Sequence, residues 1–223
     1  MVGLDAKGVP SYAFYGHGAA DRLLRSEHLT AVPASATAFH FGSYAMVVQP
    51  VAAMQRALVE REHRRSLISY DPNLRLNVEP DVAVWRDTLA WMLPRTHLLK
   101  LSDEDLKLLY PGKSPDDFAA QALADGCPLV VLTLGGEGAV AYCAAGRVAV
   151  EPVAVTVVDT VGAGDTFQAA LLTWLAEQGA LSASGVAGME LPAISAALSF
   201  AAKAAAITGG RRGADLPRRA ELR

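Results

Sequence analysis

The chain has 223 residues, of which 52% are hydrophobic, and its formal net charge is -3. This length and apolar content suit a single domain with a sizeable core. The five histidines lack metal-ligand spacing, and the two cysteines, Cys127 and Cys143, form no CxxC pair, so we expect neither a zinc site nor a disulfide framework. The basic cluster at residues 211–223 has no interleaved aromatic residues, which does not favour nucleic-acid binding. We recognise no membrane-spanning run and no signal sequence, so we expect a cytoplasmic location and no membrane partner.

Apolar runs and helical patterns alternate along the chain. Residues 1–4 and 10–15, separated by Asp-Ala-Lys-Gly, predict a hairpin. Further strands are predicted over five apolar runs: 37–41, 67–70, 97–101, 129–134 and 153–158. Helical spacing predicts helices over these ranges: 51–62, 81–92, 114–125, and from Phe167 to a stop near Gly179. Near-continuous apolar strands between helices predict a parallel sheet covered on both faces.

The segment over residues 157–167 joins two carboxylates, Asp159 and Asp165, to a glycine turn at the start of a predicted helix. Gly162 and Gly164 fall where the first backbone N–H groups of the helix lack internal partners. Those donors and the positive end of the helix dipole favour a phosphate. Taken alone, a Gly-x-Gly before a helix is equally consistent with an ordinary tight turn.

The pattern Asp-Thr-x-Gly-Ala-Gly-Asp-Thr-Phe over residues 159–167 closely resembles the C-terminal signature of the ribokinase-like (PfkB) sugar kinases. The resemblance implies an α/β, ribokinase-like three-layer fold with a mostly parallel central sheet. It implies that Asp165 is the general base and contacts the sugar hydroxyl. It also implies that the amides of Gly162, Ala163 and Gly164 form an anion hole for the phosphoryl group. ATP and Mg²⁺, with K⁺ as a further ion, are the implied cofactors, and a sugar and ATP are the implied partners.

Two segments resemble the sugar-binding segments of fructokinases in this family. Asp-Pro-Asn-Leu-Arg over residues 71–75 resembles a segment of fructokinases and 2-keto-3-deoxygluconate kinases, which implies that Asp71, Asn73 and Arg75 bind the sugar. Arg22, in an Ala-Asp-Arg segment, is implied as a sugar ligand in the same way. An ordinary turn remains the alternative for the first segment, and an exposed arginine for the second.

The nucleotide side depends on two glycine-rich loops. Thr-Leu-Gly-Gly-Glu-Gly over residues 133–138 resembles the family's nucleotide turn, and the loop after the predicted helix at 204–207 resembles the segment that flanks the adenine. The resemblance implies these ATP ligands: Thr133, Gly135, Gly138 and Gly213. Read alone, the first loop is weak support, because many strand ends need glycine.

Three acids follow Ser102, where the family often carries an acid that acts near Mg²⁺ and the triphosphate. The choice between Asp103, Glu104 and Asp105 is open, and Glu104 is taken as the Mg²⁺ ligand. A solvated helix start capped by Ser102 explains the same residues equally well. The resemblance further implies a monovalent cation near Asp159.

The resemblance begins part-way into the family sequence. Residues 1–16 resemble the later part of the family's small lid sheet, and the opening Gly-rich strands have no counterpart. We therefore expect one N-terminally truncated ribokinase-like sugar kinase domain over residues 1–223, with residues 1–16 as the remnant of a β lid. A homodimer through the lid is expected only of a complete protein.

The favoured function is ATP-dependent phosphorylation of D-fructose to fructose 6-phosphate. One alternative is a 2-keto-3-deoxygluconate kinase, which shares the segment over residues 71–75. Another is a nucleotide-binding fragment that is inactive because part of the sugar site is missing. A Rossmann-type dinucleotide enzyme is excluded, because the glycine turn at residues 162–164 does not continue as Gly-x-Gly-x-x-Gly.

Overall fold

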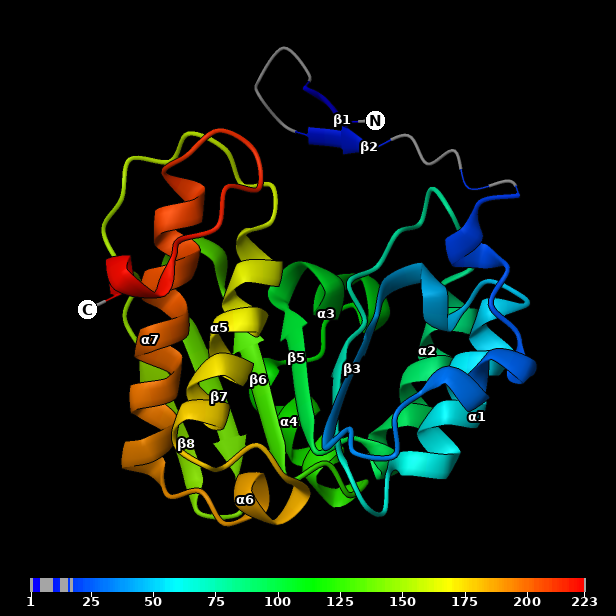
Figure 1. The fold of residues 1–223 in the computed structure, drawn as a ribbon. Helices are drawn as coiled ribbons and strands as arrows, with labels where there is room; N and C mark the ends of the chain where they lie inside the picture. The colour runs from blue at the N-terminus through cyan, green and yellow to red at the C-terminus, as the bar shows by residue number, and fades with distance from the viewer. Residues whose placement is uncertain (1, 5–9, 13–15, 17, 223) are drawn as a thin grey trace.

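The computed structural model describes residues 2–4, 10–12, 16 and 18–222. Its centre is a six-stranded sheet in the order β3-β4-β5-β6-β7-β8 (Figure 1). Four neighbouring strands run parallel: β3 (Ala38–Gly42), β4 (Leu67–Asp71), β5 (Leu98–Ser102) and β6 (Leu129–Thr133). Two antiparallel strands complete one edge: β7 (Ala139–Cys143) and β8 (Gly146–Val150). The predicted, mostly parallel sheet is confirmed.

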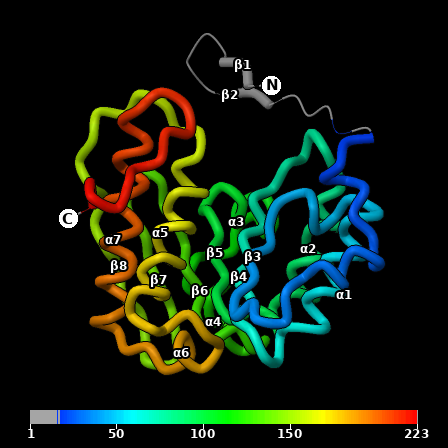
Figure 2. Tube along the Cα trace, in the orientation of Figure 1, coloured from blue at the N-terminus to red at the C-terminus, as the bar shows by residue number. Residues whose placement is uncertain are grey.

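Helices cover both faces of this sheet, and Figure 2 traces how they flank it. One face is covered by α1 (Val51–Glu62), α2 (Val82–Met92), α3 (Asp103–Leu109) and α4 (Pro115–Ala124). The other face is covered by α5 (Ala163–Glu177), α6 (Ala183–Ala187) and α7 (Leu191–Gly209). Because neighbouring strand residues point to opposite faces, Ile68 and Tyr70 enter the first core and Leu67 the second. Two apolar cores on one sheet make the predicted three-layer fold.

Local chemistry sets the helix ends where the sequence predicted them. The Asp81 side chain accepts the N–H of Ala83 at 2.9 Å and caps α2. Ser114 caps α4 by accepting the N–H of Asp117 at 3.0 Å, and a proline occupies the first helical position. The remaining helical segments are short 3-10 helices: Ala20–Arg22, Ser26–Ala31, Ser43–Met46, Leu93–Arg95, Gly135–Glu137 and Arg219–Leu222.

The predicted N-terminal hairpin is present as β1 (Val2–Leu4) paired antiparallel with β2 (Pro10–Tyr12). The turn predicted at residues 5–8 and the end of the second predicted strand at residues 13–15 lie outside the described residues. These two strands form a sheet of their own, which Figure 1 shows apart from the six-stranded sheet. It therefore adds no strand to the sheet that carries the candidate site.

The strand predicted over residues 153–158 is absent. This segment connects β8 to α5 without regular structure, and its valines are exposed, Val157 by 63%. Instead of pairing with a strand, the end of the segment meets α7, where the N–H groups of Val158 and Asp159 both donate to the Gly209 carbonyl. An apolar run forms a strand only where another strand lies beside it to pair with. The hydrophobic pattern of the run does not reveal whether such a partner exists.

α7 corrects a second expectation. It has 19 residues and a mean hydropathy of 1.4, so its length and composition alone would suit a membrane span. The sequence was expected to contain no such run. In the fold α7 packs along α5 and against β7 and β8, and its buried positions include Ile194 and Leu198 together with small residues such as Ala197, Ala201 and Ala204. These contacts bury one side of α7, and 33% of its apolar window lies inside the structure.

Candidate active site

The carboxyl ends of β4 and β5 bring opposite charges together on the face covered by α5. Ser69 and Asp71 alternate on β4 and so share that face, and Lys100 on β5 points to it as well. Lys100 Nζ donates to Asp71 Oδ2 at 2.8 Å, and the two side chains are only 6% and 4% exposed. Asp71 Oδ1 is buried and has no hydrogen-bond partner among the described residues.

The glycine turn at the start of α5 lies against one of these charges, because a Cβ added to Gly164 would stand 3.1 Å from Lys100 Nζ. Gly162 has a left-handed φ of +77°, and a Cβ there would come within 2.7 Å of the Ala214 side chain. Both facts require glycine at this position. Asp165 lies exposed in the first turn of the helix.

The backbone donors of this turn differ in availability. The Ala163 N–H donates to the Thr160 carbonyl at 3.2 Å and is therefore already engaged. Within the described part of the chain, the N–H groups of Gly162, Gly164 and Asp165 meet no acceptor. The open donors are thus two of the three expected ones, together with the amide of Asp165, which the motif did not suggest. They lie at the positive end of the helix dipole, where an anion is favoured.

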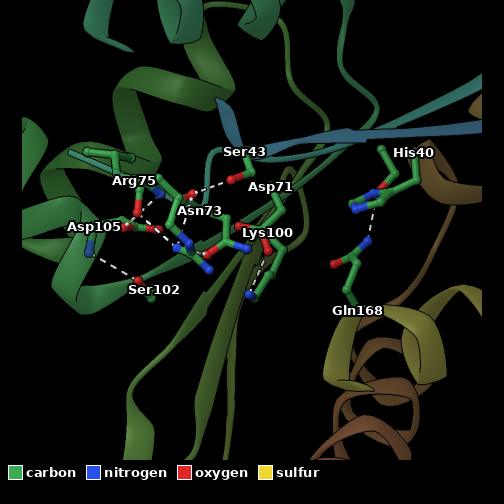
Figure 3. A network of polar contacts seen from close by, with 11 residues as sticks. His40, Ser43, Asp71, Asn73, Arg75, Lys100, Ser102, Asp105 and Gln168 are labelled. Carbon is green, nitrogen blue, oxygen red and sulfur yellow. Dashed lines mark hydrogen bonds and ion pairs between the residues drawn. The ribbon is translucent and has the colours of Figure 1, made fainter. Parts of the chain in front are cut away.

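The segment over residues 71–75 is a fixed loop beside the charged pair (Figure 3). Ser43 Oγ donates to the Asn73 carbonyl at 3.0 Å, and Asn73 itself has a left-handed φ of +41°. Arg75 Nη1 donates to Asn73 Oδ1 at 2.6 Å and to the Leu74 carbonyl at 2.8 Å. These bonds hold Asn73 and Arg75 in place at the edge of the site.

Among the three acids after Ser102, the structure brings Asp105 to this loop. Asp105 Oδ1 accepts the N–H of Leu74 at 3.2 Å, and the carboxyl is buried. Burial raises the pKa of Asp105 to about 6, with help from the charge of Asp71 and against the opposing effect of the Leu74 N–H. Glu104 is exposed, so its part in binding Mg²⁺ stays a prediction.

Ser102 has the capping role of the alternative interpretation. Its side chain accepts the N–H of Asp105 at 3.0 Å at the start of α3. Asp103 pairs instead with Lys107 one turn further along the same helix. Capping at Ser102 therefore places Asp105 on the buried side of the helix.

A polar chain next to the charged pair was missed by the sequence analysis. Gln168 Nε2 donates to Ser69 Oγ at 2.6 Å, and His40 Nδ1 lies 3.1 Å from the same oxygen. Desolvation lowers the pKa of His40, although the nearby charges of Asp71 and Asp165 oppose this. Gln168 follows Asp165 by three residues, so its position on the same helix face was a usable signal.

The candidate ATP ligands lie at two separate loops. Thr133 ends β6, and Gly135 and Gly138 follow with left-handed φ values of +56° and +91°. A Cβ on Gly138 would overlap the Val150 carbonyl oxygen, so this glycine is required by packing. Gly213, in the C-terminal loop, has a φ of +70°.

Asp159 ties that C-terminal loop to the glycine turn. Its Oδ1 accepts the N–H of Val161 at 3.0 Å, and its Oδ2 accepts the N–H of Gly213 at 2.9 Å. These two bonds lower the pKa of Asp159. The structure thus gives Asp159 a joining role, and its contact with a monovalent cation stays a prediction.

Arg22 lies next to the 3-10 helix Ser43–Met46, whose first residue bonds to the loop over residues 71–75. Its guanidinium stands over the Tyr44 ring, 5.3 Å from the ring centroid, and Tyr44 directly follows Ser43. Arg22 Nε is buried without a hydrogen-bond partner among the described residues. Arg22 therefore borders the site, and its contact with a sugar stays a prediction.

Comparison with known proteins decides the family. The family model described as "pfkB family carbohydrate kinase" matches residues 2–220. The chain belongs to the pfkB family of carbohydrate kinases. A fructokinase of Rhizobium leguminosarum bv. trifolii is 36% identical over 187 residues, which cover 84% of this chain and 57% of the relative. Fructokinase-2 of Solanum habrochaites is 32% identical over 217 residues, which cover 96% and 64%. The chain spans between half and two thirds of the length of these pfkB relatives.

Solved structures confirm the pfkB fold. Fructokinase from Xylella fastidiosa with bound ATP superposes with a TM-score of 0.86 at 27% identity, over 99% of this chain and 70% of that one. Fructokinase from Vibrio cholerae O395 with fructose, ADP and calcium bound gives 0.76 at 29% identity, over 91% and 64%. The predicted family and the predicted ribokinase-like fold are both confirmed.

Proposed function

We propose that this chain transfers the γ-phosphoryl group of ATP to a hydroxyl of a sugar, and that the sugar is D-fructose, giving fructose 6-phosphate. The observation that carries the proposal is the position of Asp165. It stands exposed in the first turn of α5 beside open backbone donors, and its neighbour Gly164 lies against Lys100, which pairs with Asp71. The named function of the similar fructokinases supports the choice of sugar.

Different residues accept the proton, stabilise the phosphoryl charge and orient the sugar. Asp165 accepts the proton of the attacking hydroxyl as general base. The N–H groups of Gly162 and Gly164, with the positive end of the α5 dipole, stabilise the charge on the phosphoryl oxygens. The side chains that orient the sugar are Asp71, Asn73, Arg75 and Arg22.

The nucleotide binds across the two glycine loops, through Thr133, Gly135, Gly138 and Gly213. A Mg²⁺ ion bound with the triphosphate would supply positive charge against the phosphate oxygens during transfer. The described residues contain no group of three or more His, Cys, Asp or Glu side chains suited to a metal. A Mg²⁺ ion that keeps several waters and the phosphate oxygens as ligands needs only one or two carboxylates from the protein. We propose Glu104 as one of these carboxylate ligands.

The remaining parts of the proposal concern ions and setting. A K⁺ ion beside Asp159 would share a carboxylate that already accepts two backbone N–H groups, and it would reinforce the join to the C-terminal loop. We propose a cytoplasmic enzyme, and a homodimer through the lid in a protein that contains the complete lid.

The test is a coupled assay with ATP and either fructose or 2-keto-3-deoxygluconate. Asp165→Asn should lower kcat about 10²- to 10⁴-fold, while ATP affinity measured by calorimetry changes little. Asp117→Asn is the control, because it removes an acid from the first turn of α4 instead of α5. Near-normal kcat in Asp165→Asn would overturn the assignment of the base. Turnover of the deoxygluconate alone would reassign the sugar, and ATP binding without turnover of either sugar would favour the nucleotide-binding fragment.

A further inference from the structure

Lys100 is the part of the site that no sequence motif explains. It interrupts an apolar strand between Leu99 and Leu101, yet its side chain is buried. Within the described part of the chain its ammonium donates to a single acceptor, Asp71 Oδ2 at 2.8 Å. Since an ammonium carries three N–H donors, two of them have no protein partner there.

The same ammonium lies against the glycine turn. A Cβ added to Gly164 would stand 3.1 Å from Lys100 Nζ, so the lysine occupies the space that a side chain at Gly164 would need. Gly164 lacks the left-handed φ of Gly162, so its close approach to Lys100 is the structural reason for a glycine. The start of α5 is already positive because of the helix dipole. A second positive charge is unfavourable there unless a negative group binds nearby.

Fold stability gives no sufficient reason for the buried pair. Burial removes both charges from water, and apolar residues of similar size often stabilise a core as well or better. Asp71 supplies one negative charge to Lys100. A phosphoryl group in transfer, with charge spread over its oxygens, would supply further negative charge at the turn.

We propose that Lys100 is a positioning residue of the phosphoryl-transfer site, whose ammonium is held by Asp71 beneath the first turn of α5 and strengthens the anion hole for the transferring phosphoryl group. This inference rests on the proposed kinase function. It adds a residue of β5 to a site otherwise built from α5 and the loop after β4 (Figure 3).

The test compares Asp71→Asn with the double variant Asp71→Asn/Lys100→Met. Asp71→Asn leaves the buried ammonium of Lys100 without its carboxylate, whereas the double variant leaves neither charge buried alone, so the double variant should melt at the same temperature as Asp71→Asn or higher. With ATP and fructose, the double variant should have a kcat about 10- to 100-fold below that of Asp71→Asn, at an unchanged KM for ATP. Lys107→Met, which removes an exposed lysine from α3, is the control and should leave kcat unchanged.

A second readout needs no sugar turnover. ADP with aluminium fluoride presents a planar anion in place of the transferring phosphoryl group, and calorimetry measures its binding. The double variant should bind ADP as Asp71→Asn does, but ADP with aluminium fluoride at least about 10-fold more weakly. Equal kcat and equal aluminium fluoride binding in the two variants, including no binding by either, would overturn the inference. Weaker aluminium fluoride binding in the double variant, with no turnover by the unmodified chain, would overturn the kinase proposal and support the role of Lys100.

Discussion

Replacement of Asp105 by asparagine should stabilise the protein, and more so at higher pH. Asp105 is 8% exposed and accepts the N–H of Leu74. Burial and the nearby Asp71 raise its pKa from 3.8 to about 6. Asp105→Asn removes the charge and keeps an oxygen that accepts the Leu74 N–H. The variant therefore separates the effect of the buried charge from that of the hydrogen bond.

The magnitude follows from the difference between the folded and unfolded pKa. The folded state holds the Asp105 proton more tightly than the unfolded chain does, so the free energy of unfolding falls as pH rises from 3.8 through about 6. The difference of about 2 pKa units corresponds to about 3 kcal/mol at pH 8, where both states are ionised. At pH 5 the folded carboxyl is still mostly protonated, and the same linkage gives about 1.5 kcal/mol.

Urea unfolding at pH 5 and pH 8 measures this difference. Asp105→Asn should exceed the unmodified protein in free energy of unfolding at both values, with the larger gain at pH 8. Asp103→Asn, which removes a half-buried carboxylate of the same helix, should change it by less than about 1 kcal/mol. An equal pH dependence in the unmodified protein and Asp105→Asn would refute the reasoning. If turnover falls in the stabilised variant, the buried charge serves the reaction at the expense of stability.

Four further outcomes are expected. Gly138→Ala should destabilise the fold by several kcal/mol because its Cβ overlaps the Val150 carbonyl, whereas Gly179→Ala, also at positive φ but in open space, should lose only about 1 kcal/mol; equal melting temperatures would contradict this. Gly162→Val should lower kcat at least about 10-fold, because it strains the turn and crowds Ala214; a normal rate would make the turn purely structural. Chelation of Mg²⁺ should abolish turnover. Replacement of K⁺ by a large organic cation should reduce it, and unchanged rates would remove the K⁺ proposal alone.

Local patterns were sufficient for α1, α2, α4 and α5 and for the four parallel strands, but they did not predict β7, β8, α6 or most of α7. α1 begins and ends at the expected residues because its apolar spacing is regular, and Asp81 and Ser114 mark the starts of α2 and α4 by their capping bonds. The motif over residues 159–167 likewise placed the glycine turn at the first turn of α5. In each of these cases the residues that decide the structure lie within a few positions of one another.

The remaining features depend on partners far apart in the sequence. Lys100 and Asp71 are 29 residues apart, and only the parallel register of β4 and β5 shows that they pair. The same holds for Gln168 and Ser69, which are 99 residues apart. The strand prediction over residues 153–158 was wrong for a related reason, because an apolar run does not reveal whether another strand lies beside it.

The bond between Asp159 and Gly213 has a consequence for the newly made protein. The two residues are 54 positions apart, and the packing of Ala214 against Gly162 lies at the same junction. During synthesis the ribosome releases the glycine turn long before it releases residues 213 and 214. Until then the turn lacks both the hydrogen bond from Gly213 to Asp159 and the contact of the Ala214 side chain with Gly162. A nascent chain therefore cannot complete this corner of the fold early, because the glycine turn gains both contacts only after residues 213 and 214 have been made.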